Sequence, residues 1–274
     1  MSTPFPTLFV SHGAPMFAIE PGLAGKRLAE LSRELPRPDA IVILSPHWMT
    51  RGEVRVTAST APKTIHDFGG FPEALYRLQY PAPGSPALAK QVVDLLRASG
   101  WKSELDHHRG LDHGAWVPLM YLAPEADIPV VQVSMSSSLD TQTAWKLGEA
   151  LKPLREMNVL LIGSGSLTHN LYEFRGHGAA EAEYVKQFAA WTKQALEARD
   201  TSALLGYEAH APSAKRAHPT DEHFLPLFIA LGAADQDFET RVLEGGVTYS
   251  VLAMDSYLFD SPHRDATKFT EGNA

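Results

Sequence analysis

The feature that most constrains the fold is a regular alternation of two kinds of segment. Short apolar runs rich in Val, Ile and Leu alternate with longer stretches whose apolar residues recur at helical spacing. Continuous apolar runs are typical of strands that are buried on both faces, and the intervening pattern is typical of amphipathic helices. The alternation therefore predicts an α/β protein with a central sheet flanked by helices.

The expected elements follow from this alternation and from the prolines and glycines that punctuate it. Neither a repeat nor a linker interrupts the chain. We therefore expect one domain over residues 1–262 and a flexible polar tail over residues 263–274. The predicted strands are 7–10, 40–44, 128–134, 159–162 and 246–254, and the predicted helices are 23–35, 88–98, 140–156, 179–198 and 220–231, with a polar loop over 207–219.

Composition excludes several classes of function. The 274 residues carry a formal net charge of -8, and no basic stripe is present, which argues against nucleic-acid binding. No apolar run is long enough to span a membrane, and the N-terminus does not resemble a signal peptide, so we expect a cytoplasmic protein without a membrane partner. Whether it is a monomer or a homo-oligomer stays open.

The chain has twelve histidines and no cysteine. The lack of cysteine excludes disulfides, thiolate zinc sites and cysteine nucleophiles. Histidine and carboxylate side chains are then the strong metal ligands that remain.

Three histidines follow predicted strands directly or after a short turn: His12, His47 and His169. In an open α/β sheet, ligands bind beyond the carboxyl ends of the strands, so these side chains can converge on one site. His223 falls in the first turn of the helix predicted over 220–231, where Thr220 can serve as the N-cap. Three neutral imidazoles on one side of a metal leave positions for substrate, and a fourth can transfer protons. The spacing is not a compact metal motif, so separate core or capping histidines remain the alternative.

Two glycine-bearing stretches lie near these histidines. The sequence Gly-Ser-Gly-Ser over residues 163–166 matches neither the dinucleotide nor the P-loop fingerprint, and we interpret it as a tight turn that lets His169 approach the site. We interpret residues 65–72 as a glycine-hinged loop that covers a pocket, and a plain surface connection is the alternative. Farther along, His113 can hydrogen-bond a substrate oxygen, or it can simply cap a helix.

At this point the sequence resembles the class III extradiol ring-cleavage dioxygenases, which are related to the catalytic subunit of protocatechuate 4,5-dioxygenase. The resemblance covers nearly the whole chain and is greatest to the 4,5-DOPA dioxygenase branch. Its motifs are residues 11–16 (SHGAPM), 45–48 (SPHW), 65–72 (IHDFGGFP), 80–84 (YPAPG), 112–114 (DHG), 168–171 (THNL) and 219–227 (PTDEHFLPL).

The resemblance implies a single α/β domain around a mixed sheet, with an active site at the carboxyl ends of its strands. It also implies Fe(II) as the working metal, and a catechol and O2 as the substrates, with a muconic semialdehyde as the product. It implies His12, His47 and His223 as metal ligands and His169 as the acid and base. The alternative third ligand is Glu222, because the protocatechuate relatives use a glutamate. We favour His223, since consecutive helical residues point about 100° apart and only one of the two can reach the metal.

The remaining site residues follow from the same likeness. We expect His113 and His66 to hydrogen-bond substrate or oxygen, and Trp48, Phe68 and Phe71 to form an aromatic wall for the ring. A site of three histidines also binds zinc readily, so purified protein can carry Zn(II). Two other functions therefore stay open on the sequence: a zinc-dependent hydrolase that uses the same histidines, and a non-catalytic metal-binding domain. The identity of the catechol is open as well, because loops read its substituents.

Overall fold

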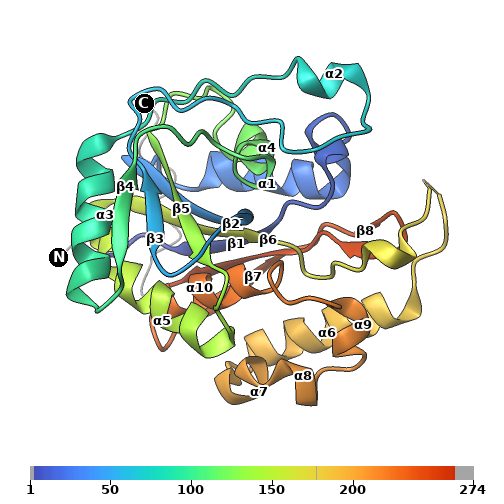
Figure 1. The fold of residues 1–274 in the computed structure, drawn as a ribbon. Coiled ribbons are helices and arrows are strands. Elements are labelled where there is room, and N and C mark those ends of the chain that lie inside the picture. The colour runs from blue at the N-terminus through green and yellow to red at the C-terminus, as the bar shows by residue number, and fades with distance from the viewer. Residues whose placement is uncertain (1–2, 177, 263–274) are drawn as a thin grey trace.

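A large mixed sheet forms the centre of the protein (Figure 1). The computed structural model describes residues 3–176 and 178–262, so the predicted tail at 263–274 lies outside the described residues. Strand order in the sheet is β4-β3-β5-β2-β6-β1-β10-β7. The four central strands, β5, β2, β6 and β1, are parallel to one another. On one side β10 pairs antiparallel with β1, and β7 pairs antiparallel with β10. On the other side β3 pairs antiparallel with β5 and parallel with β4. The strands are β1 (Thr7–Ser11), β2 (Ala40–Thr50), β3 (Val54–Thr57), β4 (Ser103–Asp106), β5 (Val130–Ser136), β6 (Val159–Gly165), β7 (Glu239–Leu243) and β10 (Ser256–Asp260).

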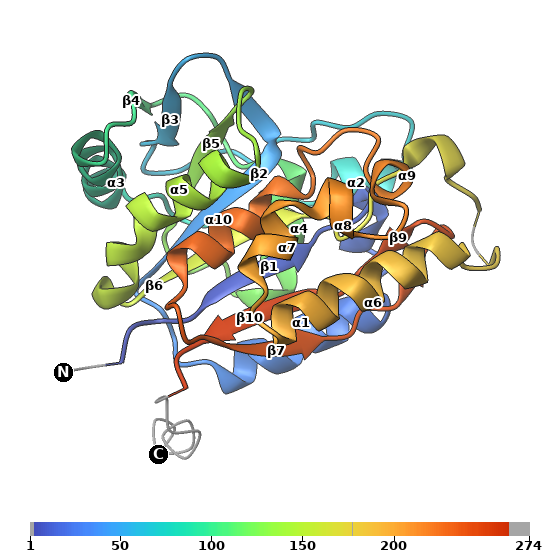
Figure 2. The same ribbon diagram turned by 90° about the horizontal axis from the view of Figure 1, so that it is seen from below.

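Helices cover both faces of this sheet, which confirms the predicted α/β class. Figure 1 shows α1 and α4 on one face and α5 and α10 on the other, and Figure 2 shows α6 lying along β10 and β7. The helices are α1 (Gly22–Glu34), α2 (Glu73–Tyr76), α3 (Pro86–Ala98), α4 (His113–Leu122), α5 (Thr141–Leu151), α6 (Glu183–Glu197), α7 (Thr201–Leu205), α8 (Tyr207–His210), α9 (Ala214–Ala217) and α10 (Leu225–Ala233), with the 3-10 turns η1 (Pro15–Ala18), η2 (Lys152–Met157) and η3 (Leu171–Glu173).

The central strands are apolar because both of their faces are covered. Every residue of β1, β5 and β6 is buried. Helix α10 is buried along its whole length between the sheet and α5, so it too is apolar on every side. No helix in the described part of the chain is both long and apolar enough to cross a bilayer.

Glycines in β6 allow α10 and the segment before it to approach the sheet closely. A Cβ atom at Gly163 would lie 2.0 Å from the Pro226 carbonyl oxygen, and one at Gly165 would lie 2.2 Å from that of His223. Both glycines belong to the strand, so the interpretation of residues 163–166 as a tight turn is wrong for its first three positions. Their role is to let two backbones touch, and this contact positions His223 beside β6.

Several element boundaries differ from the sequence predictions. The helix predicted from residue 220 begins at Leu225, and the Thr220 hydroxyl hydrogen-bonds Glu222 rather than capping that helix. Strand β2 continues past Leu44 through an irregularity in its pairing with β5, so His47 lies within the strand. The loop predicted over 207–219 contains α8 and α9.

The strand predicted over residues 246–254 is a short hairpin. Its strands are β8 (Val247–Thr248) and β9 (Leu252–Ala253). Tyr249 and Ser250 between them have φ angles of 52° and 69°. Residues other than glycine rarely adopt this left-handed backbone conformation. Because the turn contains Tyr and Ser instead of the glycine or asparagine typical of such turns, the sequence did not indicate it.

Candidate active site

Five histidines gather at the carboxyl ends of the central strands. His12 follows β1, His47 lies in the last part of β2, His169 follows β6, His113 begins α4 and His223 precedes α10. The ring of His12 is centred 5.0 Å from that of His47 and 5.5 Å from that of His223. The His47 and His113 rings are 3.9 Å apart. The structure therefore brings together histidines that are spread over more than 200 positions of the sequence.

The nitrogens of this cluster are arranged as metal ligands are. The Nε2 atoms of His12 and His47 lie 3.0 Å apart. Two imidazole nitrogens that are each about 2.1 Å from one metal, at neighbouring coordination positions, lie about 3.0–3.4 Å from each other. Nε2 of His223 is buried and has no hydrogen-bond partner among the described residues. A buried nitrogen without a partner is costly, and binding a cation removes that cost.

Burial keeps the imidazoles of His12, His47 and His223 neutral. Burial is the main reason that the pKa of His12 lies well below 6.5, and the neighbouring His47 lowers this pKa further. The pKa of His47 falls to about 3, again mainly through burial. Burial and the nearby His169 lower the pKa of His223. A neutral imidazole offers a lone pair, so at neutral pH these side chains have the form that binds a metal.

Two sets of three side chains have the spacing of a metal site. One set is His12, His47 and His113, and the other is His169, Glu222 and His223; within each set the ligand atoms lie within 4.8 Å of one another. Glu222 lies behind the His223 ring, with its Oε1 atom 3.3 Å from Nδ1. A carboxylate in that place orients a histidine ligand from behind and leaves Nε2 for the metal.

Asp67 holds His113 in place. Its carboxylate accepts hydrogen bonds from the His113 backbone N–H, at 2.9 Å, and from Nδ1 of the ring, at 3.0 Å. Burial raises the pKa of Asp67, but the bonds from His113 outweigh it and bring the pKa to about 2. His113 is not the helix cap, because the side chain of Asp112 accepts from the Ala115 N–H. This role of Asp67 was not predicted from the sequence; the one indication was that the residue belongs to the loop over 65–72.

His169 lies against His223 with the two rings stacked. Their centres are 3.5 Å apart, and their planes differ by 8°. The His169 backbone N–H donates to the Ala217 carbonyl, at 2.8 Å, which fixes the loop that carries it. Burial lowers the pKa of His169 to about 4, so the ring is neutral at pH 7 and can accept a proton.

The predicted aromatic residues divide into two groups. The Phe68 ring lies edge-on to the His113 ring at 5.7 Å and edge-on to the Phe71 ring at 5.5 Å. Phe68 and Phe71 therefore form a group beside the five histidines. His66 joins that group, with its Nε2 atom 2.9 Å from the Leu78 carbonyl oxygen. Trp48 instead lies under the Arg109 guanidinium, whose carbon is 5.4 Å from the ring centre. Its place in a substrate wall stays a prediction.

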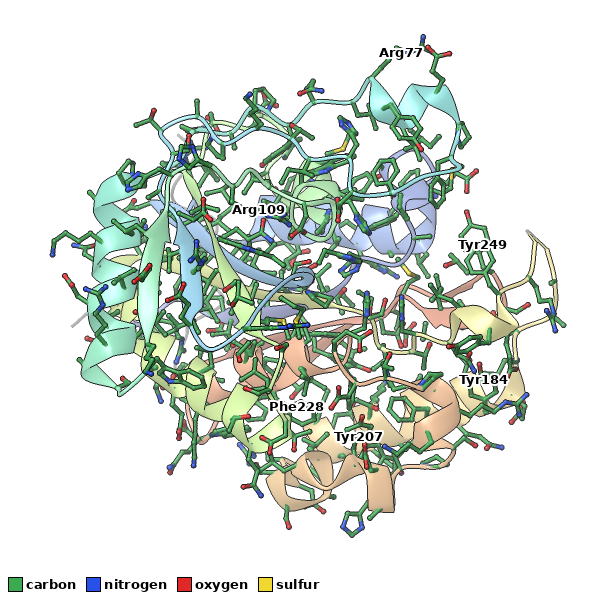
Figure 3. The ribbon with its side chains drawn as sticks, in the orientation of Figure 1. Arg77, Arg109, Tyr184, Tyr207, Phe228 and Tyr249 are labelled. Atoms are coloured by element: carbon green, nitrogen blue, oxygen red, sulfur yellow. The ribbon has the colours of Figure 1, made fainter. Side chains whose placement is uncertain are left out.

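Arg109 supports the strand that carries His47, a role that the sequence did not indicate. Its guanidinium donates to the His47 carbonyl at 3.1 Å, and it lies 3.4 Å from the buried carboxylate of Asp112. Figure 3 labels Arg109 near the centre of the molecule. The backbone of His47 is therefore held by a cation from the segment that leads into α4.

A cavity of about 340 Å³ lies next to the segment that follows His12, and residues of the 245–254 region line its other side. Ala14, Phe17, Met254 and Tyr249 contribute to its lining. The Tyr249 side chain points upward from the β8–β9 turn in Figure 3, and its hydroxyl lies 3.2 Å from a carboxylate oxygen of Glu20. Its size is in the range of small-molecule sites, but none of the five histidines belongs to its lining, so it adjoins the histidine cluster without containing it.

Comparison with known proteins identifies the family. Residues 6–260 match the model for the catalytic LigB subunit of aromatic ring-opening dioxygenase. The chain belongs to the LigB family. It is 43% identical over 259 residues to a protein of Beta vulgaris named 4,5-DOPA dioxygenase extradiol, with 93% of this chain and 96% of that protein covered.

Further relatives agree with this assignment. A protein of the same name from Escherichia coli K12 is 40% identical, with 92% of this chain and 94% of that protein covered. A crystal structure of an uncharacterized Escherichia coli K12 protein superposes with a TM-score of 0.77 at 34% identity, covering 93% of this chain and 99% of that one. This LigB-family protein is therefore an extradiol aromatic ring-opening dioxygenase, and a metal cofactor fits both the family and the buried histidines. The family assignment favours the dioxygenase over the zinc-dependent hydrolase and the non-catalytic metal-binding domain.

Proposed function

We propose that this enzyme opens the ring of a catechol with O2, that Fe(II) is its working metal, and that His12, His47 and His223 hold the iron. The observation that supports the ligand set is the facing pair of Nε2 atoms, 3.0 Å apart, together with the His223 ring, which is centred 5.5 Å from that of His12 and 5.1 Å from that of His47. Nε2 of His223 is buried and has no hydrogen-bond partner among the described residues. The relatives named for 4,5-DOPA support DOPA as the substrate.

Each histidine has a separate task in this proposal. When bound, iron supplies the electronic coupling between catechol and O2 that spin conservation denies to the free reactants. His12, His47 and His223 would hold the iron and leave positions for substrate. His169 takes a proton from a diol hydroxyl and later returns it to the opened product, because the neutral ring stacked on His223 lies beside the ligands.

The second group orients the ring. The carboxylate of Asp67 accepts a hydrogen bond from Nδ1 of His113, which leaves Nε2 of that ring to meet a diol oxygen. Phe68 packs against His113, Phe71 packs against Phe68, and both rings offer apolar surface to the aromatic substrate. His66 supports this surface from behind through its contact with Phe68.

The test is reconstitution of metal-free protein with Fe(II) under nitrogen, followed by O2 and a panel of DOPA, protocatechuate and gallate. Oxygen uptake and the visible absorbance of a muconic semialdehyde are measured together. Metal-free and Zn(II)-loaded protein serve as controls. We expect turnover with iron alone, and with DOPA above the others. Absence of turnover with every catechol would overturn the proposal.

A second experiment tests the ligand set. Substitution His223→Ala should abolish tight binding of one metal per chain, whereas Glu222→Gln should retain the metal, since Glu222 contacts the far nitrogen of the His223 ring. Metal content is measured by elemental analysis after gel filtration. The opposite result would make Glu222 the third ligand.

A further inference from the structure

Ser164 connects two parts of the active site that are far apart in sequence. It lies in β6 and is fully buried. Its Oγ atom is 3.0 Å from Nδ1 of His12 and 2.5 Å from the carbonyl oxygen of Gly114. Gly114 follows His113 in the first turn of α4. One hydroxyl group therefore touches the ring of one site histidine and the backbone next to another.

The direction of these two hydrogen bonds follows from the groups involved. A carbonyl oxygen only accepts, so the single hydroxyl proton of Ser164 goes to Gly114. The Ser164 oxygen can then only accept from His12, and His12 must carry its proton on Nδ1. The lone pair is left on Nε2, the nitrogen that lies 3.0 Å from Nε2 of His47.

We propose that Ser164 is a positioning residue that sets the tautomer and the ring orientation of His12 for metal binding. The inference rests on the proposed role of His12 as a ligand. Hydrogen bonds to the far nitrogen of a histidine ligand fix its tautomer and orientation, and their loss typically weakens metal binding about 10–100-fold. The bond to Gly114 ties the start of α4 to the same hydroxyl, so the position of His113 depends on it as well.

The chain offers a matched control two residues away. Ser166 is also fully buried, and its hydroxyl has no hydrogen-bond partner among the described residues. Substitution Ser166→Ala therefore removes the same atom at the same burial without removing a bond to a histidine. Any general effect of deleting a buried hydroxyl beside β6 should appear equally in both variants.

The experiment measures Zn(II) affinity of the metal-free wild type, Ser164→Ala and Ser166→Ala by competition with a chromophoric chelator. Circular dichroism establishes that each variant is folded. We expect Ser164→Ala to bind Zn(II) about 10–100-fold more weakly and Ser166→Ala to bind as the wild type does. Equal affinity of the two variants would overturn the inference.

A measurement on the unaltered protein tests the tautomer directly. Nitrogen NMR of histidine-labelled, metal-free wild type should show His12 protonated on Nδ1, with His12→Ala used to assign the signal. Protonation on Nε2 would overturn the inference even if Ser164→Ala failed to fold. Loss of metal in His12→Ala with full affinity in Ser164→Ala would overturn this inference alone, whereas a wild type that takes up no metal would also overturn the proposed function.

Discussion

Substitution Gly114→Ala tests how tightly the active site is packed. Gly114 is the second residue of α4, and helix propensity alone favours alanine there by about 1 kcal/mol. A Cβ atom at this position would lie 2.3 Å from Oγ of Ser45 and 3.0 Å from Cδ2 of His47. Overpacking of this kind costs about 1–3 kcal/mol. The net expectation is a loss of between about 0 and 2 kcal/mol in the free energy of unfolding.

The effect on catalysis should be larger than the effect on stability. Ordinary contacts begin at 3.4 Å, so the Ser45 side chain must move by about 1 Å. Ser45 accepts a hydrogen bond from the His47 backbone N–H, at 3.2 Å, and its movement disturbs that histidine. A misplacement of about 1 Å at a reacting centre can lower the rate about 100-fold. We expect kcat/KM to fall by about that factor.

Oxygen uptake with a catechol gives the rate, and urea unfolding gives the stability. The control is Gly176→Ala, because a Cβ atom at Gly176 meets no atom of the described residues within 4 Å and its φ angle is one that other residues adopt. The control should keep wild-type activity. Wild-type turnover in Gly114→Ala would refute the packing of Gly114 against Ser45 and His47.

Three further predictions concern proton transfer, orientation and pH. Substitution His169→Ala should lower kcat about 100- to 10,000-fold with metal content near that of the wild type, and loss of the metal would contradict its assigned role. Substitution Asp67→Asn removes the carboxylate that holds His113, so KM for the catechol should rise in steady-state assays. Zn(II) affinity should change less, because the same carboxylate lies 3.8 Å from Nδ1 of His47, beyond hydrogen-bond distance. Burial lowers the pKa of both His218 and His169 to about 4. The unfolded chain then binds more protons, so urea unfolding of metal-free protein should show full stability above about pH 6.5 and a loss as the pH falls toward about 4. Constant stability over that interval would refute the burial of these rings.

The sequence predicted the residues whose position follows from local pattern. His12 and His169 come after apolar runs, and the strands that precede them, β1 and β6, lie near the predicted positions. His47 was found for the same reason, although β2 extends beyond it. The role of His223 was predicted from the family resemblance. The local pattern did not place this residue correctly, because it predicted the helix start at Thr220 and the helix begins at Leu225. Pro226 in the first turn marks that start, and it was the better signal.

Residues that act through long-range contacts were not predictable in this way. Asp67 and His113 are 46 positions apart, and Ser164 and His12 are 152 apart. A hydrogen bond between such segments leaves no periodicity or spacing in the sequence. Edge strand β7 was missed for a different reason: its alternating exposure gives a weaker signal than the continuous apolar runs of the central strands.

The contact of β6 with the backbone at His223 and Pro226 has a consequence for how such an enzyme can change over generations. Positions 163 and 165 admit no side chain at all, because a Cβ atom would lie about 2 Å from a carbonyl oxygen. Any residue larger than glycine at either position would push the two backbones apart, so the distance between His223 and β6 cannot change by small steps. The loop that carries Phe68 and Phe71 has no such barrier, because a Cβ atom at Gly69 or Gly70 meets no described atom within 4 Å. Substitutions in this loop can therefore accumulate without changing the distance between His223 and β6.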